Sequence, residues 1–245
     1  EKMKAPVTRG RAIATAEFCT PMAAMHGHVA DLLEKADWVF LPYYFENRNP
    51  DKKTRRQYCY YTQYVPSVIA SLTEIDNSRI LSPVVKYLYS GFNTKMELYR
   101  EFKKIPGANL SFFDIASAHE KALEWKKGAA QQLRAIMTRQ QNRATDIDVL
   151  LVGRPYTILS EGLNAGIPDI FAGMKVNAFF QDMLDLNHHS FDEISPLLQE
   201  IHWEHAATIL KASLVAARTK NLFPVFITSF KCSPDSFCVG YFKKI

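Results

Sequence analysis

Three of the four cysteines in this sequence lie where a thiolate could bind a metal. Cys19, Cys59 and Cys232 each follow a strand-like apolar run or a loop after it, and each precedes a helix-like segment. Ligands collect at the carboxyl ends of strands in open α/β sheets. The free N–H groups and partial positive charge of a helix N-terminus also favour a thiolate over a thiol. Because thiolates hold iron–sulfur clusters, these positions predict an iron–sulfur site.

The spacing of the cysteines does not by itself select this site. The sequence contains no Cys-x-x-Cys pair, which iron–sulfur and zinc sites commonly show. One alternative is that the cysteines pack a core, since free cysteine is among the most buried residue types. Another is a zinc site that adds one histidine, although nothing selects which histidine. Cys238 lies inside the helix predicted after Cys232, so we interpret it as a packing residue.

Three other polar residues could line a pocket for a small substrate. Arg154 follows the apolar run 147–152 and could bind a phosphate or carboxylate at the sheet edge; the alternative is a surface arginine in a proline-set turn. His26 and His28 point about 200° apart on a helix, so they cannot easily share a metal. We expect one of them in an interface and the other exposed. Asn164 lies in a glycine-containing segment that allows close approach to the next helix start. No residue is assigned a catalytic role.

A recurring order of strand, loop and helix must position these residues, and it indicates an α/β fold with a mostly parallel sheet covered by helices. The predicted strands are 12–18, 38–41, 80–85, 147–152, 176–180 and 223–230. The predicted helices are 22–32, the segment after Cys59 with its first turn reset at Pro66, 95–143 with a break at 105–107, 163–174 and 197–218. The unbroken apolar run 147–152 suits a strand buried on both faces. We predict an N-terminal α/β lobe over 1–143, with a long linking helix, and a C-terminal α/β lobe over 144–245.

Composition and charge limit the classes of function. Apolar residues make up 47% and charged residues 22% of the chain, as in an ordinary folded protein. The net charge of +5 is spread along the sequence, although Tyr58, Tyr60 and Tyr61 follow the basic segment 52–56 and keep nucleic-acid binding as an alternative. The absence of a Gly-x-Gly-x-x-Gly or Walker motif argues against an ATP or dinucleotide site in this chain.

Two features of the sequence bear on where the protein is located. No apolar run is long enough to cross a bilayer, and the first residues lack the core of a signal peptide. With few cysteines, the simplest interpretation is a cytoplasmic protein. The first residue is not methionine and the last residues fall in an apparent helix, so we expect a fragment of a longer chain.

Several motifs occur in order along nearly the whole chain. They are Cys19-Thr20-Pro21, His26-Gly27-His28, Val39-Phe40-Leu41-Pro42, Cys59-Tyr60, Val152-Gly153-Arg154-Pro155-Tyr156, Leu163-Asn164-Ala165-Gly166-Ile167-Pro168, Ile201-His202-Trp203 and Phe230-Lys231-Cys232-Ser233-Pro234-Asp235-Ser236-Phe237. Together they resemble the domain associated with acyl-CoA dehydratase activases, which is related to 2-hydroxyglutaryl-CoA dehydratase components and double-cubane cluster proteins.

This resemblance implies two flavodoxin-like lobes and an iron–sulfur cluster, either a 4Fe-4S cluster or a double cubane, held by Cys19, Cys59 and Cys232. It implies that an ATP-dependent activase supplies electrons, which pass at low potential to a substrate such as a 2-hydroxyacyl-CoA under anaerobic conditions. It also allows a homodimer. Two positions depart from the pattern. Tyr60 replaces a proline, and Ser233 replaces a glycine that would give the loop more freedom. A scaffold module that keeps the fold but has lost the cluster is the alternative.

Overall fold

The computed structural model describes residues 4–47, 54–73, 75–86, 91–141 and 146–245, and they divide into two units. The C-terminal unit is built mainly from Gly128–Ile245 and also includes Phe18–Pro21. The N-terminal unit comprises Pro6–Glu17 and Met22–Lys127. Each unit is described by itself below.

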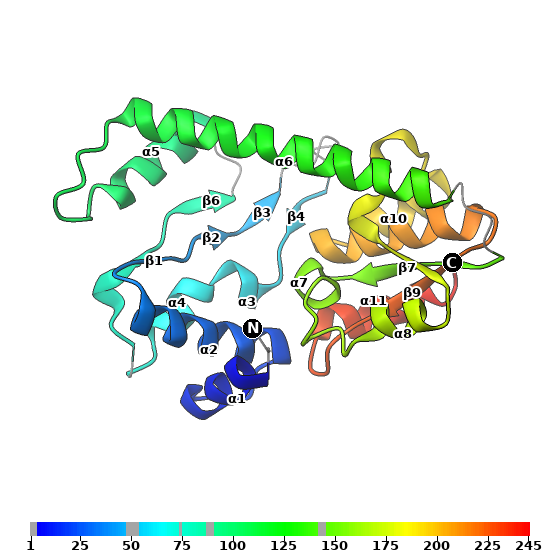
Figure 1. The fold of residues 1–245 in the computed structure, drawn as a ribbon, viewed down its shortest axis with the longest axis horizontal. Coiled ribbons are helices and arrows are strands. Elements are labelled where there is room, and N and C mark those ends of the chain that lie inside the picture. The colour runs from blue at the N-terminus through cyan, green and yellow to red at the C-terminus, as the bar shows by residue number, and fades with distance from the viewer. Residues whose placement is uncertain (1–3, 48–53, 74, 87–90, 142–145) are drawn as a thin grey trace. The chain divides into compact units, whose positions relative to one another are not determined.

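A three-stranded parallel sheet forms the centre of the C-terminal unit (Figure 1). The central strand β7 (Asp148–Gly153) pairs with β8 (Asn177–Phe180) on one side and with β9 (Leu222–Ile227) on the other. Every residue of β7 is buried, which confirms the predicted strand buried on both faces. Among the described residues, β9 forms one edge of this sheet, and it contains Pro224.

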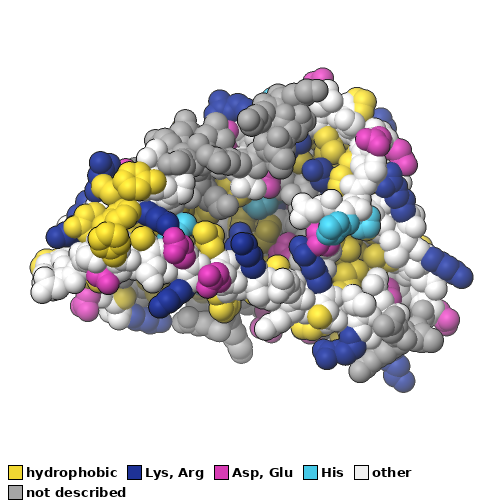
Figure 2. Space-filling model, turned by 90° about the horizontal axis from the view of Figure 1, so that it is seen from above, with side chains coloured by type: hydrophobic (Ala, Val, Ile, Leu, Met, Phe, Trp, Pro, Cys, Tyr) yellow, Lys and Arg dark blue, Asp and Glu magenta, His cyan; other side chains and the backbone are white. Residues whose placement is uncertain are grey.

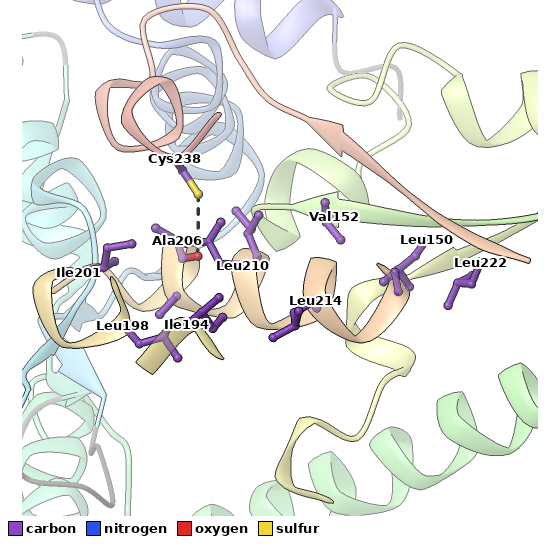
Figure 3. Packing of buried hydrophobic residues seen from close by; sticks show 14 of the residues in the cluster. Leu150, Val152, Ile194, Leu198, Ile201, Ala206, Leu210, Leu214, Leu222 and Cys238 are labelled. Atoms are coloured by element: carbon purple, nitrogen blue, oxygen red, sulfur yellow. Dashed lines mark hydrogen bonds between the residues drawn. The ribbon is translucent and has the colours of Figure 1, made fainter. Parts of the chain in front are cut away.

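Alternate residues of β7 pack into separate cores on the two faces of the sheet, as the two-residue period of a strand requires. Leu150 and Val152 join the larger core, part of which is drawn in Figure 3. Val149 and Leu151 join a smaller core on the other face. The larger core is covered by α9 (Ser195–Glu200), α10 (Glu204–Arg218) and α11 (Ser233–Phe242). The smaller core is covered by α7 (Pro155–Ile158) and α8 (Ile167–Gly173).

The N-terminal unit combines helices with short strand pairs. Its described helices before residue 91 are α1 (Lys4–Ile13), α2 (Thr20–Lys35), α3 (Tyr60–Gln63) and α4 (Val65–Ala70). The parallel pairs are β1 (Val39–Phe40) with β5 (Ile80–Leu81) and β2 (Tyr43–Tyr44) with β6 (Val84–Lys86). The antiparallel pair is β3 (Glu46–Asn47) with β4 (Arg56–Gln57). Across both units, the described strands pair mostly in parallel, which confirms the α/β class. The two flavodoxin-like lobes stay a prediction.

Helices α1 and α2 pack closely at two glycines. A Cβ atom added at Gly10 would lie 1.7 Å from the backbone oxygen of Ala23, and one added at Gly27 would lie 1.9 Å from the backbone oxygen of Pro6. These positions therefore exclude any side chain. Beside this contact, Arg9 of α1 forms ion pairs with two acidic residues of α2, Asp31 and Glu34.

The long helix predicted in the middle of the chain is present as α6 (Phe112–Gln141), and it follows α5 (Gly91–Phe102) after the predicted break. Its start is fixed by reciprocal hydrogen bonds. Ser111 donates from its backbone N–H and its hydroxyl to Asp114 Oδ2, and the Asp114 N–H donates back to Ser111 Oγ at 3.2 Å. The division between the two units falls within this helix, at Gly128.

Several predicted elements were wrong or incomplete. The predicted strand 80–85 is split into the short strands β5 and β6, which pair with different partners, and the predicted strand 223–230 ends at Ile227. The predicted strand 12–18 is instead the end of helix α1 followed by irregular backbone, because α1 packs on α2 through Gly10. The predicted helix 197–218 is broken between α9 and α10, and the predicted helix 163–174 begins only at Ile167, after Gly166 at φ +69°. The predicted reset at Pro66 is confirmed, since α4 begins with that proline in its first turn. No helix of the described segments has both the length and the apolar character to cross a membrane.

Candidate functional site

Each of the three candidate cysteines lies directly before a helix. Cys19 precedes α2, whereas Cys59 and Cys232 are the N-cap residues of α3 and α11. The predicted position at a helix start is therefore confirmed for all three. The predicted position after a strand is confirmed for Cys232, which follows β9. Cys59 follows the short antiparallel strand β4, which is not one of the predicted strands. It is wrong for Cys19, because the preceding segment is not a strand.

The three cysteines are divided between the two units. Cys19 and Cys232 belong to the C-terminal unit, and Cys59 belongs to the N-terminal unit. Within the described residues, no three His, Cys, Asp or Glu side chains are gathered as a group that could hold a metal ion. Cys59 instead has its Sγ 3.6 Å from Thr62 Oγ1 within its own turn. Cluster binding by these three residues stays a prediction.

Cys232 is buried, with 8% of its surface exposed. Burial raises the pKa of this thiol to about 12, and the nearby Arg154 guanidinium opposes that shift only partly. Its place at a helix N-terminus, taken alone, predicts a thiolate. Burial outweighs that effect, so Cys232 is a protonated thiol when no metal is bound.

A buried network surrounds the start of α11 and centres on Asp235, which is 1% exposed. Arg154, 2% exposed, donates from Nε to Asp235 Oδ1 at 2.8 Å, and Thr228 Oγ1 donates to Asp235 Oδ2 at 2.7 Å. Arg154 also donates from Nη1 to Tyr156 Oη at 3.0 Å. A buried charge requires such a partner. Arg154 is therefore not a surface residue of a turn; it binds a carboxylate, but one from its own chain.

His205 of α10 lies beside this network. Its ring meets the ring of Tyr156 edge-on, with the centroids 6.0 Å apart. Burial first, and the Arg154 charge second, lower the pKa of His205 well below its ordinary value. The imidazole is therefore neutral at pH 7. The sequence alone did not identify Asp235 and Thr228 as parts of this network, or His205 as its neighbour. The only available signal was an acidic residue in the first turn after Cys232, where it favours a helix N-terminus.

The other two predicted pocket residues hold local backbone structure. Asn164 donates from Nδ2 to the Ile158 oxygen at 3.0 Å and accepts from the Gly166 N–H at 2.9 Å, which shapes the turn before α8. His26 is fully buried, and its Nδ1 lies 2.7 Å from the Met22 oxygen one turn earlier in α2. A role for either residue in binding a substrate stays a prediction.

Cys238 lies in the larger core of the C-terminal unit, as the packing interpretation predicted. It is fully buried on α11, and Figure 3 shows its Sγ directed at the Ala206 oxygen of α10, at 3.9 Å. Burial raises the pKa of this thiol to about 12 as well. Cys238 is therefore a suitable control residue for experiments on the other cysteines.

Charged side chains are interspersed on the surface seen in Figure 2. On that face, lysine and arginine side chains occur among acidic, apolar and uncharged groups. This arrangement matches the scattered charge of the sequence. It differs from the concentrated basic stripe that nucleic-acid binding proteins usually present.

Comparison with known proteins identified one family. The family model described as CoA enzyme activase uncharacterised domain matches residues 2–184, which is more than half of the chain. The matched segment contains Cys19, Cys59 and Arg154, whereas Cys232 lies beyond it. Neither the curated proteins nor the solved structures gave a match. On the extent of the family match, the chain belongs to the CoA enzyme activase uncharacterised domain family.

Proposed function

We propose that this domain binds an iron–sulfur cluster through Cys19, Cys59 and Cys232 and transfers electrons together with an ATP-dependent activase. The observation that carries the proposal is that each of these cysteines immediately precedes a helix. Backbone N–H groups at a helix start are free to donate to a ligand, and they stabilise negative charge on sulfur. Membership of a CoA enzyme activase-related family supports an activase as the electron donor.

The donor chemistry at these positions fits such a cofactor. Thiolate sulfur is the usual ligand of iron–sulfur clusters, and a bound cluster would supply one-electron transfer at a potential set by burial and hydrogen bonding. Since burial raises the pKa of the Cys232 thiol to about 12, iron must displace a proton there. Cluster binding should therefore release protons and strengthen as the pH rises.

A set of three protein ligands would also allow the cluster to bind a substrate directly. A cubane held by three thiolates has one iron without a protein ligand, which leaves room for water or a substrate. An acyl-CoA is the substrate class that the resemblance implies, and a homodimer would allow two cubanes to meet. We include both in the proposal because the resemblance allows them.

Anaerobic reconstitution followed by counting iron and sulfide per chain tests the proposal. We expect Cys19→Ser, Cys59→Ser and Cys232→Ser each to bind clearly less cluster than the parent chain. Cys238→Ala is the matched control, because Cys238 lies in the core, and it should keep the parental iron content. A parent chain that stays colourless after reconstitution would contradict cluster binding and favour the scaffold alternative, whereas zinc released to a chelator would favour the zinc site.

A further inference from the structure

The carboxylate of Asp235 joins three elements of the C-terminal unit. Its Oδ1 accepts from Arg154, directly after β7, and its Oδ2 accepts from Thr228, directly after β9. Asp235 itself lies in the first turn of α11. Because both oxygens are used and the side chain is buried, this one group fixes the start of α11 to the carboxyl ends of two neighbouring strands.

The loop between β9 and α11 carries Cys232 in a constrained conformation. Lys231 has φ +66°, a left-handed conformation that a residue with a side chain adopts only when its surroundings hold it there. The Cys232 N–H donates to the Ser229 oxygen at 3.2 Å, and Ser236 Oγ donates to the Cys232 oxygen at 3.0 Å. Both backbone groups of Cys232 are thus hydrogen-bonded, and Asp235 belongs to the helix turn that binds its carbonyl oxygen.

We propose that Arg154 and Asp235 are positioning residues that hold Cys232 in place as a cluster ligand. The proposal rests on the proposed function and deepens it. Replacing a buried ion pair by apolar residues of similar size is often neutral or stabilising, so stability alone does not explain a charged pair here. A charged pair with directional hydrogen bonds does fix geometry, because the guanidinium and the carboxylate accept few relative orientations.

The decisive variant is the double substitution Arg154→Met with Asp235→Leu, which removes both charges and leaves no buried charge unpaired. Thr228→Val is a second, milder variant that removes one hydrogen bond to Asp235. Arg218→Met is the matched control, because Arg218 pairs with Glu193 in the same unit without contacting Asp235. Arg154→Lys keeps the charge and tests partial rescue.

Hydrogen exchange on the cluster-free protein is the first measurement. In the double variant, amides of residues 229–236 should exchange at least about tenfold faster, while amides of α10 keep their parental rates. Thr228→Val should change the same loop amides in the same direction, and Arg218→Met should change neither set. Equal acceleration in α10 and in the loop would indicate a purely structural role and overturn the proposal, as would unchanged loop exchange in both the double variant and Thr228→Val.

The second measurement uses the reconstituted protein. We expect the double variant to bind less iron and to show an altered electron paramagnetic resonance spectrum, with Arg154→Lys closer to the parent. A parental iron content and spectrum in the double variant would overturn the proposal. If the parent itself binds no iron, the proposed function fails and Cys232 has no cluster to be positioned for, whereas the exchange measurement still decides whether the pair holds the loop.

Discussion

Arg154 Nε lies 2.8 Å from Asp235 Oδ1, although the two residues are 81 positions apart in the sequence. Their side chains are only 2% and 1% exposed, so water cannot replace either partner. We expect Arg154→Ala to lower the free energy of unfolding by about 3–5 kcal/mol, because it leaves Asp235 as an unpaired buried charge. Urea denaturation measures this loss. Arg218→Ala, at an exposed ion pair, should cost less than about 1 kcal/mol. Equal losses in the two variants would contradict the role assigned to burial.

His205 makes the stability of the C-terminal unit depend on pH. Since its pKa is lowered on folding, the unfolded chain takes up a proton near pH 6.5 that the folded chain does not. The stabilising contribution is therefore present above about pH 6.5 and is lost as the pH falls below it. We expect the parent to lose about 1–2 kcal/mol more than His205→Phe between pH 7 and pH 5, as measured by urea denaturation. Parallel pH profiles for the two proteins would show that His205 does not carry this dependence.

Substitution of a glycine should have opposite effects inside and outside the close contact between α1 and α2. Gly10→Ala should destabilise the protein by about 1–3 kcal/mol, because the added Cβ would overlap the Ala23 backbone. Gly128→Ala is the matched control inside helix α6, where an added Cβ meets no atom within 4 Å. It should stabilise the protein by about 0.5–1 kcal/mol. Thermal unfolding of both variants checks this pair, and a stable Gly10→Ala protein would rule out the close packing of α1 on α2.

The raised pKa of Cys232 predicts low thiol reactivity in the cluster-free protein. With a pKa of about 12 in place of the ordinary 9.0 of a cysteine thiol, the thiolate fraction at pH 8 falls on the order of a thousandfold. Alkylation of Cys232 at pH 8 should therefore be far slower in the folded protein than in urea, and it should accelerate as the pH rises. Peptide mass spectrometry after timed labelling measures the rate. Fast labelling of Cys232 in the folded protein would show that its thiol is neither buried nor protonated.

Elements with a strong local signal could be predicted from the sequence. The apolar run of β7 identifies a strand covered on both faces, and Thr20 before Pro21 identifies the start of α2. The strand predicted over 12–18 was wrong. Its apolar residues look like a strand, but α1 extends to Ile13 because Gly10 allows contact with α2. That contact depends on tertiary packing, which local sequence does not contain.

The candidate site shows the same limit. The helix starts after Cys19 and Cys232 could be predicted locally, because a polar residue and a proline follow each of these cysteines. The start of α3 after Cys59 has no such proline and no side-chain cap. The network around Asp235 could not be predicted locally, because Arg154 and Thr228 reach Asp235 only when β7, β9 and α11 pack. His205 comes to lie beside it only when α10 packs there as well. The burial that raises the pKa of Cys232 has the same origin.

Pro224 in the edge strand β9 has a consequence for how the protein behaves in concentrated solution. Proline has no backbone N–H, and natural sheets place it in edge strands, where it interrupts the row of donors that an incoming strand would need. The neighbouring Phe223 is 53% exposed, and an exposed apolar side chain at a free edge favours pairing with a strand of another molecule. Pro224 therefore disfavours the pairing of a further strand with this edge, and with it the aggregation of folded chains through their sheets.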